Sequence, residues 1–277
     1  MAIKMDYDSK GKLLTEKVEL VPEGTGLVEG KVTLITGATL GIGLAMATLF
    51  AQHRAKVIIT GIEEEIGKYN AQFLRDCGCE VTYYNANAFY RNEIHDLFEE
   101  IRKTYGRIDI LINSAGYNIP AHFMEATESQ YRQLMGIHGL AHVYTLQEAI
   151  PMMQKQGGGV VLEFGSKSSD RPGDYDPFYC MAKAGVKLMS KSLNMEFGPD
   201  NIRINCICPG PTITGMTQDN DGNIVPAFAK GGPVLKQTSL RKIAMPIDIA
   251  KAALIICSDY AGYVAGLTYN VDGGIVI

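Results

Sequence analysis

The sequence predicts an α/β fold in which one parallel β-sheet carries helices on both faces. Seven short apolar runs, each bounded by turn residues, have the length and composition of buried strands. Longer segments with helical periodicity separate them, so strands and helices alternate from residue 31 to residue 274. This alternation is typical of parallel strands joined by helical crossovers. With 277 residues, 46% of them hydrophobic, the chain is long enough to bury the core that such a fold requires.

The individual elements follow from the same pattern. We predict strands over residues 31–37, 56–61, 80–86, 109–116, 159–166, 203–210 and 267–274. The clearest helical patterns cover residues 91–106 and 131–153, and residues 178–190 also have helical character. Residues 32–52 contain no charge and have the length of a membrane span, but three central glycines divide them. A buried strand, a glycine turn and a helix fit that stretch better, so no membrane span is expected.

The composition also limits the classes of partner. The formal net charge is −4 and no run of five basic residues occurs, so we expect neither nucleic acid nor an anionic membrane as a partner. The N-terminal residues show no signal-peptide core and no lipidation motif, which favours a cytoplasmic protein. The cysteine spacing matches no metal framework, so we predict reduced thiols and no metal site. The cysteines are Cys77, Cys79, Cys180, Cys206, Cys208 and Cys257.

Two short motifs indicate chemistry. The first βα turn reads TGATLGIG, and its glycines at positions 37, 41 and 43 suit a sharp turn that approaches a pyrophosphate at a helix N-terminus. Further along, Tyr179 and Lys183 are four residues apart in a helical segment and therefore share a helix face. A phenol beside an ammonium group suggests acid–base chemistry rather than ion pairing.

Several motifs occur in an order that resembles the short-chain dehydrogenase/reductase family. They are TGATLGIG, NSAG (113–116), YCMAK (179–183), PGPTIT (209–214) and NVDGG (270–274). The resemblance covers about residues 27–277 and implies a single Rossmann domain with a seven-stranded doubly wound parallel sheet, commonly assembled as a homotetramer. Residues 1–26 precede it. The apolar residues of this segment predict an arm that packs against a neighbouring subunit, and a frayed terminus is the alternative. They are Leu13, Leu14, Val18, Leu20 and Val21.

The resemblance assigns roles to the catalytic residues. Lowering the pKa of Tyr179 from about 10 to about 7 requires roughly 4 kcal/mol of preferential stabilisation of the phenolate. Lys183 and an oxidised nicotinamide would supply positive charge, so that Tyr179 exchanges a proton with the substrate oxygen. The family's serine lies thirteen residues upstream, which is Ser166, and its hydroxyl would donate to the carbonyl oxygen. Ser168 and Ser169 compete for this role, although loop hydrogen bonds suit them better.

The fourth catalytic position departs from the family pattern. Relatives carry an asparagine thirteen residues before a proline, and the count from Pro151 reaches His138. The asparagine usually holds a water that links the lysine to solvent. His138 would hold the same water or carry the proton itself, and a buried packing histidine is the alternative.

Cofactor preference is read at the end of the second predicted strand. Gly61 replaces the aspartate that often marks NAD enzymes, while Leu40 and Ile62 replace the basic residues that mark NADP enzymes. The acidic run that begins at Glu63 would repel a 2′-phosphate, so we favour NAD(H) over NADP(H). The same run also suits a solvated first turn of a helix.

The remaining cofactor contacts are implied by the family. Asn87 would face the adenine, Asn113 would border the adenosine ribose, and Thr212 and Thr214 would contact the nicotinamide carboxamide. The complete set comprises Gly37, Thr39, Leu40, Gly41, Ile42, Gly43, Gly61, Glu63, Asn87, Asn113, Ala115, Gly116, Tyr179, Lys183, Pro209, Thr212 and Thr214.

The substrate is the least defined part of the prediction. Residues 216–239 are rich in glycine and turn residues and suit a mobile lid. Five residues near the presumed cleft predict a largely apolar pocket: Tyr117, Ile119, Phe123, Tyr175 and Met181. The chain thus resembles the family's bacterial hydroxysteroid dehydrogenases, with a 20β-type enzyme as the first candidate. Acyl-carrier-protein ketoreductases, sugar or polyol dehydrogenases and, more distantly, a non-catalytic dinucleotide sensor are alternatives. Asp176 stands where enoyl reductases of the superfamily place their tyrosine, which disfavours them.

Overall fold

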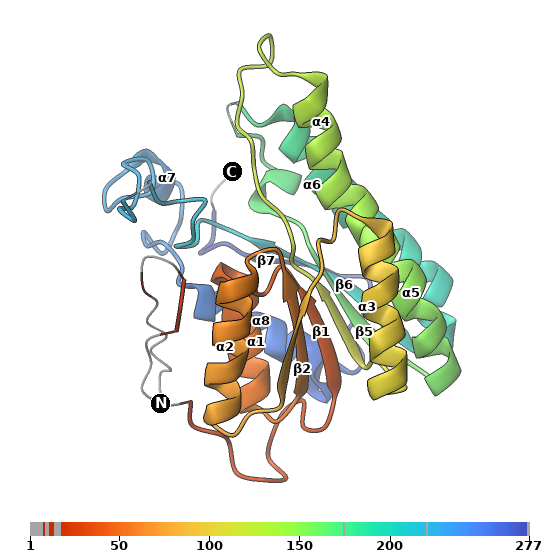
Figure 1. The fold of residues 1–277 in the computed structure, drawn as a ribbon. Helices are drawn as coiled ribbons and strands as arrows, with labels where there is room; N and C mark the ends of the chain where they lie inside the picture. Colours follow the sequence, from red (N-terminus) through yellow and green to blue (C-terminus); the bar gives the residue numbers. More distant parts are fainter. Residues whose placement is uncertain (1–7, 9–10, 14–17, 174, 220, 276–277) are drawn as a thin grey trace.

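A seven-stranded parallel sheet forms the centre of the protein (Figure 1). The computed structural model describes residues 8, 11–13, 18–173, 175–219 and 221–275. Within these residues the strand order is β3-β2-β1-β4-β5-β6-β7, and every neighbouring pair is parallel. The strands are β1 (Val32–Thr36), β2 (Lys56–Gly61), β3 (Val81–Asn85), β4 (Ile110–Asn113), β5 (Gly159–Phe164), β6 (Ile202–Pro209) and β7 (Thr268–Val271). The predicted Rossmann-type fold is therefore confirmed.

Helices cover both faces of the sheet (Figure 1). One buried cluster joins α1, α2 and α8 to the sheet, and a second joins α3 and α5 to the opposite face. The helices are α1 (Gly41–Gln52), α2 (Glu64–Asp76), α3 (Arg91–Thr104), α4 (Glu128–Met135), α5 (Ala141–Gln156), α6 (Pro177–Phe197), α7 (Pro233–Lys236) and α8 (Pro246–Cys257). Successive strand residues alternate between the clusters, as Leu34 and Ile35 do, because side chains of a strand point to opposite faces.

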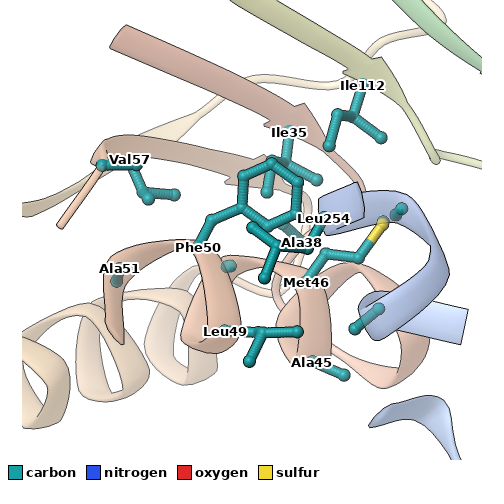
Figure 2. Close-up of a cluster of buried hydrophobic side chains, with 14 of the residues drawn as sticks. Ile35, Ala38, Ala45, Met46, Leu49, Phe50, Ala51, Val57, Ile112 and Leu254 are labelled. Atoms are coloured by element: carbon teal, nitrogen blue, oxygen red, sulfur yellow. The ribbon is translucent and has the colours of Figure 1, made fainter. Parts of the chain in front are cut away.

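The first cluster explains the uncharged stretch in the sequence. α1 packs against β1 and β2 and, sideways, against α8 on the same face of the sheet, so most of its side chains are buried. Phe50 packs there near Ile35 and Leu254 (Figure 2). A helix buried all round needs no polar face. Among the described residues, no helix is both long and apolar enough to cross a membrane.

The strand order places a crevice at the carboxyl ends of the central strands. The chain crosses from β3 at one edge back to β4, which lies beside β1, so the order reverses between β1 and β4. In open α/β sheets, ligands bind outside the carboxyl ends of the strands at such a switch point. The loops after β1, β4, β5 and β6 all leave from this edge.

The N-terminal extension packs on its own chain where it is described. Leu13 and Val18, which we expected to face a neighbouring subunit, are instead buried in the cluster formed with α1 and α2. The Asn70 amide fixes this segment, accepting from the Leu13 backbone N–H at 3.0 Å and donating to Gly11 O at 3.1 Å. Leu14 lies outside the described residues. These contacts attach the extension to α2 of the same protomer.

The helix predicted over residues 131–153 contains an irregular turn. The chain passes from α4 into a π-helical segment, Gly136–Leu140, and then into α5. π-Helical turns inside α-helices often occur at functional sites. Here the segment carries His138.

Candidate active site

Tyr179, Ser166 and Lys183 come together at the carboxyl end of β5. Ser166 lies two residues beyond β5, and its hydroxyl is close enough to the Tyr179 phenol, in the first turn of α6, to lower the pKa of that phenol. Lys183 is one helical turn further along α6 and is only 4% exposed. Its Nζ donates to Phe164 O at 2.7 Å and lies 5.8 Å from the centroid of the Tyr179 ring. The structure thus places the three predicted catalytic residues in one cluster.

The protonation states of this cluster are dominated by burial. Burial lowers the pKa of Lys183 to about 8, which leaves the side chain mostly an ammonium at neutral pH. Burial also raises the pKa of Tyr179 to about 12, opposed by the hydrogen bond with Ser166. In the protein alone, desolvation of the phenolate is the largest effect, so the acidification expected from Lys183 and a bound oxidised nicotinamide together stays a prediction. In this state Tyr179 is a neutral hydroxyl, suited to donating a proton.

The two competing serines have different roles. The Ser169 hydroxyl donates to Lys183 O at 3.0 Å and accepts from the Ser166 backbone N–H at 3.1 Å. The Ser168 backbone N–H donates to Ser166 Oγ at 3.1 Å. Ser169 therefore holds the loop against α6, and Ser166 is left as the serine that faces the phenol.

His138 packs against Tyr179, the predicted catalytic tyrosine. Its ring, 1% exposed, meets the Tyr179 ring edge-on, with the centroids 5.3 Å apart. Nε2 lies 2.7 Å from Tyr117 O, which can only accept, so Nε2 carries the proton and Nδ1 is an acceptor. Burial, and then the charge of Lys183, hold the pKa of His138 well below its usual value. His138 is thus a neutral imidazole that can accept a hydrogen bond but resists carrying a proton.

Gly116 of the NSAG motif makes room for this ring. A Cβ atom at position 116 would lie 2.3 Å from His138 Cε1, which is a severe overlap. His138 Nδ1 has no hydrogen-bond partner among the described residues. A buried acceptor of this kind usually pairs with a water or a ligand group.

The glycine turn after β1 has the geometry of a dinucleotide cradle. Gly37 has φ +61°, and a Cβ there would lie 2.6 Å from Ala115 Cα, so only glycine lets the loops after β1 and β4 approach this closely. Thr36 Oγ1 accepts from the backbone N–H groups of Ser114 and Ala115, both at 3.1 Å. The N-terminus of α1 directly follows this turn, as phosphate binding requires. These residues fit a bound dinucleotide.

A carboxylate stands beside this turn at the end of β2. Thr39 Oγ1 donates to Glu63 Oε2 at 2.5 Å, which holds the carboxylate next to the loop. A Cβ at Gly61 would lie 2.6 Å from Thr39 Oγ1, so glycine is required for this contact. Thr39, Gly61 and Glu63, all predicted cofactor residues, therefore converge, whereas Ile62 points into solvent.

Two residues predicted to contact the cofactor form hydrogen bonds with other residues of the protein. Asn87 Oδ1 accepts from the Phe89 backbone N–H at 3.0 Å and so closes a local turn. Asn113 is buried, donating from Nδ2 to Glu163 Oε1 and accepting at Oδ1 from Thr145 Oγ1, both at 2.8 Å. The Asn113 side chain therefore braces β4 against β5, as expected, and its place beside the adenosine ribose stays a prediction.

The loop after β6 lies beside the glycine turn. β6 ends at Pro209, and the Thr212 hydroxyl donates to Gly210 O at 3.0 Å. The Thr214 side chain approaches the glycine turn, because a Cβ at Gly41 would lie 3.5 Å from Thr214 Cγ2. The predicted pyrophosphate and carboxamide regions are thus adjacent.

Apolar side chains and one polar pair lie on the presumed substrate side of the site. Ile119, Tyr175 and Phe178 line a small cavity between α4 and the start of α6. Beside it, Asn118 Nδ2 donates to Asp176 Oδ1 at 2.8 Å. Met181 was expected here, but it is two residues beyond Tyr179 on α6 and hence about 200° around the helix. It is exposed on the outer face instead.

Sequence reasoning missed the buried neighbours of this site. His142 of α5 and Glu163 of β5 form a buried hydrogen-bonded pair behind the predicted catalytic residues. The one available signal was Glu163 itself, a charged residue in the otherwise apolar strand GVVLEF. The described residues contain no cluster of three or more acidic, histidine or cysteine side chains that could hold a metal ion.

Comparisons with known proteins agree with this geometry. A family model described as enoyl-(acyl carrier protein) reductase (adh_short_C2) matches residues 37–276. The 3-oxoacyl-[acyl-carrier-protein] reductase FabG of Chlamydia trachomatis serovar D is 33% identical over 253 residues, covering 90% of this chain and 99% of that protein. The chain therefore belongs to the short-chain dehydrogenase/reductase family, and it is an oxidoreductase that acts on CH–OH and C=O groups.

Two solved structures are also similar to this chain in fold and sequence. L-Sorbose reductase from Gluconobacter frateurii, complexed with NADPH and L-sorbose, has a TM-score of 0.83 at 30% identity, covering 90% of this chain and 97% of that one. A 7α-hydroxysteroid dehydrogenase complexed with NADH and 7-oxo glycochenodeoxycholic acid has a TM-score of 0.85 at 28% identity, covering 92% and 98%. A nicotinamide dinucleotide is thus the cofactor class of the structural neighbours.

Proposed function

We propose that the protein is an NAD(H)-dependent oxidoreductase that interconverts a ketone and a secondary alcohol, with a steroid as the first candidate substrate. The observation that carries the reaction class is the cluster of Tyr179, Ser166 and Lys183 beside the glycine turn. A structural neighbour that binds NADH and an oxidised bile acid supports the substrate class. The 20β type stays a prediction.

The cluster supports a simple division of roles. In reduction, the Tyr179 hydroxyl gives its proton to the carbonyl oxygen, while the Ser166 hydroxyl donates a second hydrogen bond to that oxygen. A reduced nicotinamide bound at this site would supply the hydride that the carbonyl carbon gains. The Lys183 ammonium stabilises the phenolate that Tyr179 becomes. His138 packs against the phenol and offers Nδ1 as an acceptor for a proton-carrying water.

The preference for NAD(H) rests on Glu63. Its carboxylate, held by Thr39 at the end of β2, would repel a 2′-phosphate and can accept from ribose hydroxyls. The solved neighbours include both an NADH and an NADPH complex, so relatedness alone does not choose between them. The ratio of kcat/KM for NADH and NADPH tests this choice, and a preference for NADPH would contradict it.

A 3-oxoacyl-carrier-protein reductase is the second candidate, favoured by the identity to FabG. Sugar or polyol reduction is the third, favoured by the sorbose reductase structure and by the polar pair Asn118–Asp176. For a steroid we point to the exposed aromatic side chains of Tyr117, Phe123 and Tyr175 around the cleft. Purified protein incubated with NADH or NADPH and a panel of steroids, 3-oxoacyl thioesters and ketoses separates these candidates through absorbance of the reduced cofactor. Consumption with thioesters or ketoses alone would refute the steroid proposal.

We also propose a homotetramer in the cytoplasm. Met181, Leu188 and Met195 are exposed and spaced by seven residues, so they form one apolar stripe along α6. A second exposed apolar group lies at the end of α8 and in the segment after it, and two such faces suit two different dimer contacts. It consists of Ile255, Tyr260, Tyr263 and Leu267. All six cysteines lie among the described residues and are free thiols, which suits a reducing compartment. Sedimentation of the purified protein as a monomer would contradict the assembly.

A further inference from the structure

A buried hydrogen-bonded pair of side chains lies behind the predicted catalytic cluster. His142 of α5 and Glu163 of β5 are 2% and 0% exposed, and His142 Nδ1 is paired with Glu163 Oε2. The other carboxylate oxygen accepts from Asn113 Nδ2 at 2.8 Å. Both oxygens of Glu163 are therefore occupied, and the side chain is held in one orientation.

The hydrogen bonds around this pair also fix the orientation of the Asn113 amide. The Thr145 hydroxyl donates to Asn113 Oδ1 at 2.8 Å, so the Asn113 amide must present its NH₂ group to Glu163. Asn113 and Glu163 are also register partners on the adjacent strands β4 and β5. A donor on each side suits an ionised carboxylate.

Stability is a weak explanation for such a pair. Removing a carboxylate from water costs several kcal/mol, and apolar residues of similar volume often serve a core equally well. The position of the pair indicates a different role. Glu163 immediately precedes Phe164, whose carbonyl oxygen accepts from Lys183 Nζ at 2.7 Å. His142 lies one turn beyond His138 on the same helical segment.

Lys183 lacks a direct counter-charge. Among the described residues, no carboxylate forms an ion pair with it. Burial lowers the pKa of Lys183, and the neighbouring groups Cys206, Glu163 and Cys208 raise it again. In an interior of low dielectric constant, a charge acts over several ångströms without direct contact. Glu163 can thus support the ammonium through space.

Other titratable groups also face Lys183, from every element packed against it. They are Tyr179 on α6, His138 and His142 on the helical segment opposite, Glu163 on β5, and Cys206 and Cys208 on β6. The hydrogen bond with Cys208, together with burial, raises the pKa of Cys206, which leaves a neutral thiol. The same hydrogen bond lowers the pKa of Cys208 to about 7, so Cys208 is the second anionic candidate.

We propose that Glu163, oriented by His142 and Asn113, is a positioning residue that holds the catalytic Lys183 side chain in its ammonium form. This role rests on the proposed function only for its catalytic consequence. The charge coupling between the two residues is a property of the protein alone, so it can be tested without cofactor or substrate.

The first test is a double-mutant cycle on the unfolding of the cofactor-free protein at neutral pH. Glu163→Gln keeps the volume and the hydrogen bond from Asn113 but removes the charge. Lys183→Met removes a buried ammonium, and we expect it to raise the melting temperature by about 3 °C more in the Glu163→Gln background than in the wild type. Additive effects of the two substitutions would overturn the proposal.

The second test is the pH profile of ketone reduction by the same variants. Activity should fall as Lys183 loses its proton, and in Glu163→Gln this fall should occur about one pH unit lower than in the wild type. If the rate of Glu163→Gln falls but the descending limb of its pH profile stays at the wild-type pH, Glu163 has a merely structural role and the proposal is overturned. If the wild type reduces no ketone of the panel, the proposed function fails, while the unfolding cycle still decides the coupling.

Two controls and one rescue complete the design. Glu148→Gln changes an exposed pair of the same chemistry, His95 Nδ1 to Glu148 Oε1 at 2.9 Å, and should show neither effect. Cys208→Ser should leave the descending limb in place, and a displacement equal to that of Glu163→Gln would assign the role to the thiol instead. If Glu163→Gln does not fold, a second variant combines it with His142→Leu, which removes the mismatched imidazole. We then expect the same shift of the descending limb to lower pH and the same non-additive effect of Lys183→Met on the melting temperature.

Discussion

Replacing Lys183 with methionine should stabilise the cofactor-free protein while abolishing its catalytic function. The pKa of Lys183 is about 8 in the folded protein, compared with 10.5 for an ordinary lysine. Because one pKa unit corresponds to about 1.4 kcal/mol, keeping the ammonium buried at neutral pH costs about 3 kcal/mol of folding free energy. Methionine avoids this cost, but it loses the hydrogen bond to Phe164 O, worth about 1 kcal/mol. The net gain is about 2 kcal/mol, or roughly 5 °C in melting temperature for a chain of this size.

The pH dependence of this gain is its clearest signature. Below about pH 8, Lys183 is charged in both the folded and the unfolded state, so the full advantage of methionine is present. Between about pH 8 and 10.5 the unfolded state binds more protons than the folded state, so the wild type gains stability and the advantage shrinks. Thermal or urea unfolding at neutral and alkaline pH measures this difference. A destabilised Lys183→Met protein at neutral pH, or a difference that does not change with pH, would refute the reasoning.

A matched control is available one turn further along α6. Lys187 is less buried than Lys183 and pairs with Asp170. Lys187→Met should therefore change the melting temperature little or lower it slightly, because partly exposed ion pairs contribute little to stability. An equal stabilisation by both substitutions would indicate a general effect of methionine on α6 rather than relief of a buried charge.

Four further predictions concern Tyr179, His138, the cofactor site and the N-terminal extension. Tyr179→Phe should reduce turnover about a hundredfold or more while the cofactor dissociation constant is preserved, and an unchanged rate would exclude the tyrosine as the proton donor. His138→Asn should keep about a tenth or more of the activity, because an amide can hold the same water, and a collapse with intact folding would show that imidazole itself is needed. Glu63→Gln should improve the ratio of NADPH to NADH use about tenfold in kcat/KM, and no change would separate this carboxylate from cofactor choice. Asn70→Ala and deletion of residues 1–24 should both lower the melting temperature. Asn70→Ala should lower the free energy of unfolding by roughly 2 kcal/mol. An unaltered melting temperature in both variants would favour a frayed extension.

The fold and the positions of the catalytic residues were accessible from the sequence for physical reasons. The glycines at 37 and 43 are required because backbone from neighbouring loops or turns passes where a side chain would lie. Tyr179 and Lys183 share a face by helical periodicity, which does not depend on the rest of the fold. The same periodicity should have excluded Met181 from the cleft, so that error was one of interpretation.

Protonation states were not accessible in this way. The sequence pattern placed an ammonium beside a phenol and indicated an acidified tyrosine, but the sign of the shift depends on how much water both groups lose. In the folded protein, desolvation dominates at both Tyr179 and Lys183. The extent of desolvation follows from strands and helices that are far apart in the chain.

The sequence by itself determined the alternation of strands and helices, the glycine cradle and the spacing of the catalytic pair, because these depend on local backbone geometry and on the period of apolar residues. Only the tertiary structure decided that Leu13 packs into the core of its own chain, that His138 leans on Tyr179 from a π-helical turn, and that Glu163 meets His142 behind Lys183. Each of these contacts joins residues that are distant in sequence, and their energies arise from burial and through-space charge. Such effects exist only once the chain has folded.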